Sequence, residues 1–196
     1  KKLAKKLSKV QRLARWLDNE HVDVRVWYEP LARGLLTAAW RSRGQVRLVI
    51  DATRVSQQHQ LLMVALTYRR RTLPIAWTWV QCRKGHSSGP AQEALFAYIR
   101  QLLPPQAAVL VLGDSEFTPV QKVFAAWGWS YALRQKGSHL VRCSAHEPWL
   151  ACEQLVTGPG QQRWLTDVHL TQTHQHRTNL LALWPTGETE PWLIAT

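Results

Sequence analysis

Two aspartates, each at the end of an apolar run, are the residues in this sequence best suited to carry out chemistry. Asp51 follows the run 48–50, and Asp114 follows the run 109–113. Short aliphatic runs of this kind indicate buried strands. Two carboxylates brought together repel each other unless a proton or a divalent cation lies between them, so the pair predicts a metal site or an acid–base pair. The alternative is that each aspartate only caps a turn or a helix.

The segments around these aspartates predict how the chain positions them. After Asp51, two apolar runs flank a basic turn, which predicts an antiparallel three-stranded meander. A helix then precedes the strand that ends at Asp114, and a helical crossover implies that this strand is parallel to an earlier one. The expected order is β-β-β-α-β-α-β, an α/β fold with a mixed sheet. The elements are strands at 48–50, 61–68 and 73–80, a helix at 91–103, a strand at 109–112, a helix from Thr118 and Pro119 to Trp127, and a strand at 129–134.

The two ends of the chain differ from this central part. Residues 1–44 predict a basic amphipathic helix that ends near Asp18, followed by a second helix from Pro30 to Trp40. Residues 137–196 predict antiparallel sheet, and residues 45–136 form the expected core between the two ends. The short alternating runs behind the sheet prediction are 139–143, 154–157, 163–170, 179–184 and 191–195.

Charge is the strongest clue to a partner. The 196 residues carry a formal net charge of +12, with a pI near 10.3, which favours a polyanion such as nucleic acid. Lys5, Lys9 and Arg12 on the first helix either face solvent or contact the DNA backbone. The sequence contains no apolar run long enough to span a membrane and no apolar signal core, so we expect a cytoplasmic protein.

Three further groups of residues have candidate roles. Arg69, Arg70 and Arg71 share one turn with no acid nearby, and we expect them to contact the DNA backbone. The cysteines, Cys82, Cys143 and Cys152, are expected to be reduced and structural. A zinc site formed by two of them with His139 and His146 is the alternative, although the spacing matches no common ligand pattern.

Other residue types suggest roles that we expect to be structural. Most of the eleven tryptophans, including Trp77, Trp79, Trp127 and Trp164, lie at apolar positions, so core packing is preferred to base stacking. Glu116 is expected to be a charge at a helix start rather than a metal ligand. The histidines near Asp167 are expected to be solvated turn residues rather than ligands; they are His169, His174 and His176.

Three segments together carry a resemblance to a known family. They are Leu48-Val49-Ile50-Asp51-Ala52-Thr53, Leu110-Val111-Leu112-Gly113-Asp114-Ser115-Glu116-Phe117 and Trp192-Leu193-Ile194-Ala195-Thr196. In this order they resemble the DDE transposases of bacterial insertion sequences, of the insertion-sequence-four type. The resemblance covers the chain from about Tyr28 to its end, and it implies a ribonuclease H-like fold with a β-rich insertion after the second catalytic aspartate.

The resemblance also implies an activity and a site. The family cleaves DNA strands and transfers them by means of two divalent ions, Mg²⁺ or Mn²⁺. Asp51 and Asp114 correspond to its first two catalytic carboxylates and to metal ligands. The implied partner is double-stranded DNA, meaning the element ends and the target, and a homodimer in the DNA complex fits the family. The implied location is the bacterial cytoplasm, with the protein on the nucleoid when it is bound to DNA.

One departure from the family pattern limits these implications. The third carboxylate of the family is a glutamate within Tyr-x-x-Arg-x-x-x-Glu, on a helix beyond the β-rich insertion, and the sequence stops at Thr196 before such a helix. None of Glu147, Glu153, Glu188 and Glu190 is a convincing replacement. We therefore expect a C-terminally truncated transposase that is inactive as this chain alone. The alternatives are a non-catalytic basic DNA-binding remnant and another ribonuclease H-like nuclease.

Overall fold

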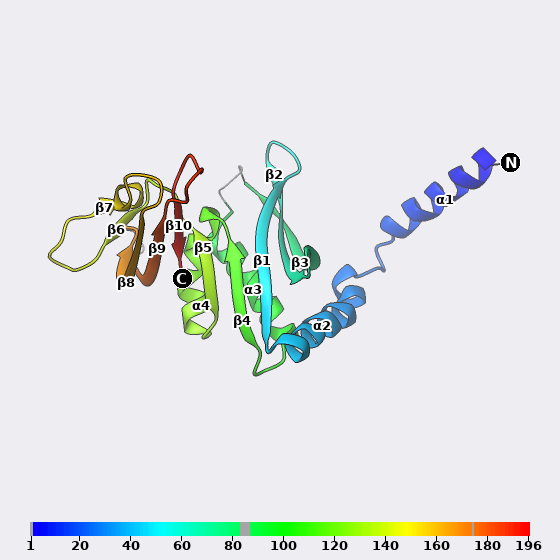
Figure 1. The fold of residues 1–196 in the computed structure, drawn as a ribbon. Helices are drawn as coiled ribbons and strands as arrows, with labels where there is room; N and C mark the ends of the chain where they lie inside the picture. Colours follow the sequence, from blue (N-terminus) through cyan, green and yellow to red (C-terminus); the bar gives the residue numbers. More distant parts are fainter. Residues whose placement is uncertain (1, 83–86, 174) are drawn as a thin grey trace.

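One continuous mixed sheet organises the molecule (Figure 1). The computed structural model describes residues 2–82, 87–173 and 175–196, and the side chains of residues 2–7, 16 and 17 lie outside that description. The sheet has ten strands in the order β3-β2-β1-β4-β5-β10-β9-β8-β6-β7. The strands are β1 (Gln45–Arg54), β2 (His59–Tyr68), β3 (Arg71–Gln81), β4 (Ala108–Gly113), β5 (Ser130–Arg134), β6 (Leu140–Arg142), β7 (Leu150–Ala151), β8 (Gln162–Leu170), β9 (His176–Leu183) and β10 (Trp192–Ala195).

Helices join and cover these strands. No helix among the described residues is long and apolar enough to cross a membrane. The α-helices are α1 (Lys2–Leu17), α2 (Val24–Arg43), α3 (Gly89–Leu102) and α4 (Gln121–Ala126), and the 3-10 helices are η1 (Ser115–Val120) and η2 (Cys152–Leu155).

The first five strands follow the predicted order. Strands β1, β2 and β3 pair as an antiparallel meander, and β4 lies parallel to both β1 and β5. Parallel neighbours require a crossover, which α3 provides before β4, and η1 with α4 provides before β5. The expected meander and the expected parallel pairing are therefore confirmed. The mixed α/β sheet is compatible with a ribonuclease H-like fold.

Alternation along the strands separates the two faces of this sheet. Leu48, Ile50 and Val111 are almost fully buried, whereas their neighbours along each strand are more exposed. Phe96 of α3 and Phe124 of α4 pack edge to face on the buried side, with their ring centroids 4.7 Å apart. The helices after β3 and β4 therefore cover the face that carries Ile50, and the residues between the buried positions point to the opposite face.

Helix α2 begins six residues before the predicted start at Pro30. Asp23 caps it, because the Asp23 carboxylate accepts hydrogen bonds from the backbone N–H groups of Arg25 and Val26. Pro30 therefore lies inside the helix rather than at its first position, and that part of the prediction was wrong. Gly44 ends the helix in the left-handed conformation, at φ 67°, and its N–H bonds to the carbonyl of Trp40.

The helix expected to start at Thr118 also begins earlier. Asp114 caps the 3-10 helix η1 by accepting a hydrogen bond from the backbone N–H of Glu116. Thr118 lies inside η1, where its hydroxyl bonds to the carbonyl of Ser115 at 3.0 Å and to the side chain of Gln135 at 3.2 Å. The predicted helix start at Thr118 was wrong, because Asp114 caps η1 at Ser115 and the α-helix α4 follows only from Gln121.

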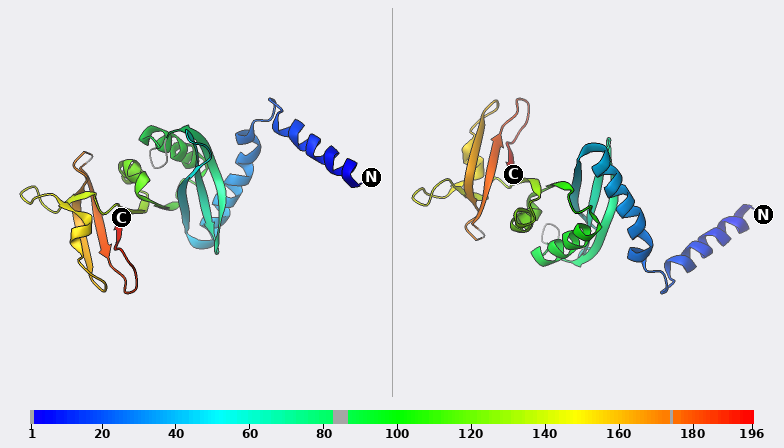
Figure 2. Two further views of the ribbon diagram at one scale, coloured as in Figure 1. Left: turned by 90° about the horizontal axis from the view of Figure 1, so that it is seen from above. Right: turned by 90° about the horizontal axis from the view of Figure 1, so that it is seen from below.

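The β-rich tail continues the central sheet. Strand β10 pairs with β5 on one side and β9 on the other, so the last strand of the sequence joins the tail to the core. Residues 154–157, which were expected to form a strand, lie partly in the 3-10 helix η2, so that expectation was wrong. Figures 1 and 2 show α1 and the tail strands at opposite ends of the molecule.

Candidate metal centre

Asp51 lies in β1, and Asp114 directly follows β4, the neighbouring parallel strand. Strands β1 and β4 pair with Val49 opposite Leu112, and continuing this register by two residues brings Asp51 opposite Asp114. The residues just before them, Ile50 and Gly113, face the helix-covered core. Because successive side chains of a strand alternate, both aspartates point to the other face. The strand spacing of about 4.8 Å brings the two carboxylates within reach of a shared ligand.

Each of these carboxylates has one oxygen committed to local backbone. Oδ1 of Asp51 accepts from the N–H of Ala52 at 2.8 Å, and Oδ1 of Asp114 accepts from the N–H of Glu116 at 2.9 Å. Neither carboxylate forms an ion pair with any residue that the structure describes. Hard divalent cations prefer oxygen ligands such as these, so the donor set fits Mg²⁺ or Mn²⁺ in chemistry. Among the described residues, however, no group of three or more potential ligands is assembled.

A hollow of about 400 Å³ opens beside Asp114. The tail contributes two carboxylates to its wall, Glu153 from η2 and Glu190 from the turn before β10. Glu190 is neutralised by an ion pair with Arg134. The sequence interpretation set both glutamates aside because they follow loop signals. The pairing of β10 with β5 brings Glu190 to this hollow, and a hydrogen bond from the N–H of Glu153 to the carbonyl of Gly137 holds Glu153 beside it. No local sequence pattern indicates either contact.

Arg134 is a candidate site residue that the sequence analysis missed. Strand β5 pairs with β4 so that Gly113, the last residue of β4, lies opposite Leu133, and continuing this register by one residue brings Arg134 opposite Asp114. Arg134 therefore continues the row of Asp51 and Asp114 across the sheet, and half of its side chain is exposed. A guanidinium beside two carboxylates is well placed to hold a phosphate group. The alternation within 130–134 was the only sequence signal for its orientation.

Glu116 serves the backbone around it rather than the row of Asp51 and Asp114. Its carboxylate accepts hydrogen bonds from the N–H of Ser87, at 2.8 Å, and from the Ser87 hydroxyl. The buried amide of Gln92 donates to the carbonyl of Glu116 at 3.2 Å and to the hydroxyl of Ser87 at 2.9 Å. This network ties η1 to the start of α3. It supports the expected structural role of Glu116.

The predicted DNA-backbone contacts lie away from the two aspartates. Arg69 and Arg70 form the turn between β2 and β3, and Arg71 opens β3. Asp51 pairs with Met63, five residues before Tyr68, so about 17 Å of strand separates the turn from the aspartate. Arg69 stacks over the ring of Tyr68 at 5.4 Å and has a left-handed backbone, at φ 56°.

The basic residues of α1 are also remote from the site. Figure 1 shows α1 projecting away from the sheet, and Lys9 and Arg12 are exposed on it. The side chain of Lys5 lies outside the described residues. The DNA-binding role of these three residues and of the arginine turn stays a prediction. The structure does not gather them with Asp51 and Asp114 into one patch.

Two of the four tryptophans named in the sequence analysis are not core residues. Trp79 of β3 is 60% exposed and Trp164 of β8 is 54% exposed, so the expectation of core packing was wrong for both. Trp77 and Trp127 are partly buried, as expected, and Trp127 packs against the core. Alternation explains the error, because an aromatic residue in a strand can face either side of a sheet.

The remaining histidine and cysteine candidates have structural partners or isolated positions. The ring of His176 bonds to the hydroxyl of Tyr131 at 3.0 Å, and His174 lies outside the described residues. Burial raises the pKa of the Cys152 thiol to about 12, whereas Cys143 is exposed. Cys152 is therefore an unreactive core thiol. The three cysteines are free, in agreement with the expected reduced state.

Gly113 is required by the close approach of the core to the strand that carries Asp114. A Cβ atom at this position would lie 2.9 Å from Cγ2 of Ile50, 3.0 Å from Phe117 and 3.1 Å from Leu133. We expect Gly113→Ala to lower the free energy of unfolding by about 1–3 kcal/mol through overpacking, measured by urea denaturation. The matched control is Gly158→Ala, because no atom lies within 4 Å of a Cβ there. Equal effects of the two changes would contradict the packing argument.

The stability of the fold should depend on His176 as the pH falls. Burial, and then the charge of Lys122, lower the pKa of His176 in the folded state. The unfolded chain takes up this proton near pH 6.5, whereas the folded chain resists it. Stability is therefore complete above about pH 6.5 and decreases as the pH falls below that value toward the lower pKa of the folded state.

The measurement is urea denaturation at pH values above and below this window. We expect His176→Gln to reduce the loss of stability in acid, whereas the same change at the exposed His21 should leave it unaltered. A loss of equal size in both variants would assign the pH dependence to other groups.

Comparisons with known proteins give no family for the chain. No protein-family model matches it. No curated protein matches its sequence. A piggyBac transposase synaptic complex with hairpin DNA is similar in structure, with a TM-score of 0.46 and 13% identity over 76% of this chain and 32% of that one. This chain thus spans about a third of the length of that transposase.

Two structures of human endonuclease V are also similar. One has a TM-score of 0.40 at 12% identity, and the match covers 87% of this chain and 82% of the endonuclease chain. The catalytic domain of the same enzyme has a TM-score of 0.35 at 12% identity, and the match covers 89% of this chain and 82% of that domain's chain. Similarities at these scores are too weak to define a family.

Proposed function

We propose that this chain is the core of a metal-dependent DNA-cleaving enzyme, specifically a DDE transposase of the insertion-sequence-four type. The observation that carries the proposal is the parallel pairing of β1 with β4, whose register, continued by two residues, sets Asp51 opposite Asp114. The net charge of +12 supports a DNA partner. The sequence motifs around both aspartates support the transposase type among DNA-cleaving enzymes.

The residues of the row divide the chemistry between them. Asp51 and Asp114 are the carboxylates that would hold Mg²⁺ or Mn²⁺. Two such ions would activate a water or a 3′-hydroxyl and stabilise the leaving oxygen. Arg134 orients the phosphodiester by pairing with a phosphate oxygen, for which its ion pair with Glu190 must exchange. Because this ion pair is exposed, exchanging it for a phosphate contact costs little free energy.

The test is nicking of supercoiled plasmid DNA in Mg²⁺ or Mn²⁺ by the protein completed with a helix that carries Tyr-x-x-Arg-x-x-x-Glu, because this chain alone lacks the third carboxylate and is expected to be inactive; the same reaction in chelator is the comparison. Nicking that requires the divalent ion supports the proposal. Salt-dependent DNA binding without nicking, together with no Mn²⁺ affinity at the two aspartates, would contradict it and define a non-catalytic DNA-binding module instead. Cleavage of RNA–DNA hybrids in preference to DNA would indicate a different nuclease.

A further inference from the structure

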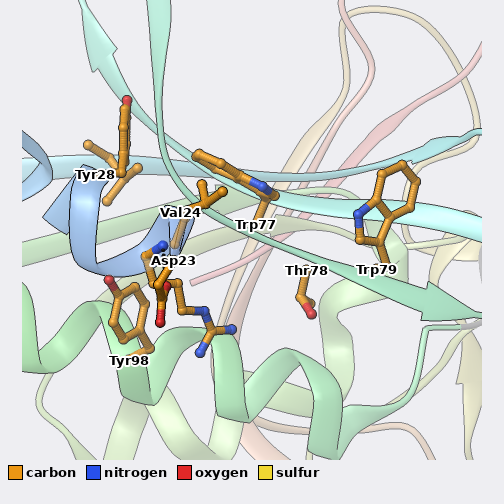
Figure 3. A pocket seen from close by; sticks show the side chains of 10 residues that line it. Asp23, Val24, Tyr28, Trp77, Thr78, Trp79 and Tyr98 are labelled. Carbon is orange, nitrogen blue, oxygen red and sulfur yellow. Dashed lines mark hydrogen bonds between the residues drawn. The ribbon is translucent and has the colours of Figure 1, made fainter. Parts of the chain in front are cut away.

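A pocket with aromatic walls lies at the free edge of the sheet. Its volume is about 350 Å³, within the range typical of small-molecule sites. Strand β3, the edge strand, contributes Trp77 and Trp79, while α2 contributes Tyr28 and α3 contributes Tyr98 (Figure 3). Trp79 is 60% exposed, so its ring is accessible to a ligand rather than used in packing.

Contacts between the lining residues fix the shape of the pocket. The rings of Tyr28 and Trp77 pack edge to face with centroids 5.2 Å apart, and the hydroxyl of Tyr28 donates to the carbonyl of Pro74 at 2.8 Å. Figure 3 shows Trp77 and Trp79 projecting to the same side of β3, with Thr78 projecting to the other. Two indoles on alternate residues of one strand present flat faces about 7 Å apart along that strand.

The polar part of the pocket wall carries one cation and one anion. The guanidinium of Arg25 lies over the ring of Tyr98 at 5.0 Å from its centroid. Asp23 also lines the pocket, and one oxygen of its carboxylate, Oδ1, accepts the two hydrogen bonds that cap α2. Nearby Glu29 is paired with Arg33, with Oε1 and the guanidinium 2.8 Å apart. Arg25 is therefore the cation that a phosphate beside this pocket would meet.

The pocket is in register with the candidate metal centre. Trp77 pairs with Met63, and Met63 pairs with Asp51, so the three residues form one row across β3, β2 and β1. Directly paired residues of antiparallel strands share a face, so Trp77 and Asp51 are on the same face. Two strand spacings separate them by about 10 Å. A DNA strand covers this distance in about three nucleotides, at its duplex rise of about 3.4 Å.

From these observations we propose that the pocket binds an unpaired nucleobase of the DNA strand that reaches the two aspartates. Flat aromatic walls suit the π-face of any base, and Arg25 suits the phosphate beside it. A base inside a duplex is already stacked on its neighbours, so only an unpaired or extruded base enters. The aromatic pocket thus selects DNA that is locally single-stranded near the cleaved bond. The position near a cleaved bond rests on the proposed function, whereas the binding of an unpaired base does not.

A second copy of the chain is a poorer occupant. Each copy carries a net charge of +12, so two copies repel each other, whereas a nucleic acid strand brings compensating charge. The open cation at Arg25 adds to this preference.

The test compares binding of the purified protein to three fluorescent probes by anisotropy. The probes are oligothymidylate, a fully paired duplex, and the same duplex with one bulged thymine. We expect Trp79→Ala to weaken binding of oligothymidylate and of the bulged duplex about 5- to 150-fold, the effect of losing one stacked base. Binding of the paired duplex should be unchanged, and Trp79→Tyr should restore most of the loss. The matched control is Trp164→Ala, an equally exposed tryptophan on β8.

Each outcome decides the proposal. Equal weakening on all three probes, or no weakening on any, overturns it. If Trp79→Ala changes only the oligomeric state in solution, the pocket is a protein interface and the proposal is wrong. These binding readouts need no metal and no cleavage. An Asp51 variant that loses nicking but binds the three probes as the parent protein does would separate the proposed function from base binding. A Trp79 variant that loses base binding but still nicks DNA would separate them equally.

Discussion

Plasmid nicking in Mn²⁺ by the protein completed with a helix that supplies the third carboxylate should fall at least about 100-fold when Asp51 is changed to Asn. Even the loss of a partner outside the metal ligands costs 10- to 100-fold in such sites, and Asp51 is placed to be a direct ligand. Asn keeps the shape and the hydrogen bond from Ala52 but removes the charge that a divalent ion requires. The residue that it faces, Asp114, cannot compensate, because one of its oxygens is already used in capping η1.

The control for this experiment separates metal binding from DNA binding. Asp18→Asn makes the same change of charge at an exposed position next to α1, and nicking should be unaffected. Both variants should bind DNA as tightly as the parent protein, because removing a carboxylate does not weaken attraction to phosphate. Undiminished nicking by the Asp51 variant would exclude this residue from the chemistry.

Local sequence patterns were sufficient to predict the core of the fold. Alternation and turn chemistry located the meander, and the helical crossover required β4 to be parallel to an earlier strand, as observed. The errors were at helix starts. Asp23 and Asp114 each cap a helix earlier than Pro30 and Thr118 suggested. A cap depends on which side chain can reach the free N–H groups, and several candidates within a few residues of each other look equivalent in sequence.

The site was only half predictable, for a different reason. Asp51 and Asp114 follow buried strands, and this local signal was visible in the sequence. Arg134 reaches the same row only because β5 pairs in a particular register with β4, and Glu190 reaches it because β10 pairs with β5. Pairing between strands that are distant in the sequence is set by tertiary packing, so no local pattern could have identified these residues. The domain boundaries at 44 and 136 remain a prediction.

The largest loss of stability should follow the removal of Phe124. This ring is fully buried beneath β4 and β5, and it packs on Phe96, on Trp129 with centroids 6.0 Å apart, and on Tyr131 with centroids 6.2 Å apart. Phe124→Ala should cost about 3–5 kcal/mol, because the cavity is lined by rigid rings that cannot collapse into it. For a chain of this length that corresponds to about 2–4 °C of melting temperature per kcal/mol.

Calorimetry of two matched variants of α4 tests the argument. Lys122→Ala, on the exposed side of the same helix, should change the free energy of unfolding by less than about 0.5 kcal/mol. Phe124→Leu should lose less than the alanine variant, because it fills part of the space. If Phe124→Ala changed the free energy of unfolding as little as Lys122→Ala, the aromatic cluster would not be what holds α3 and α4 against the sheet. In that case the strands that carry Asp114 and Arg134 would be fixed by the sheet pairing alone.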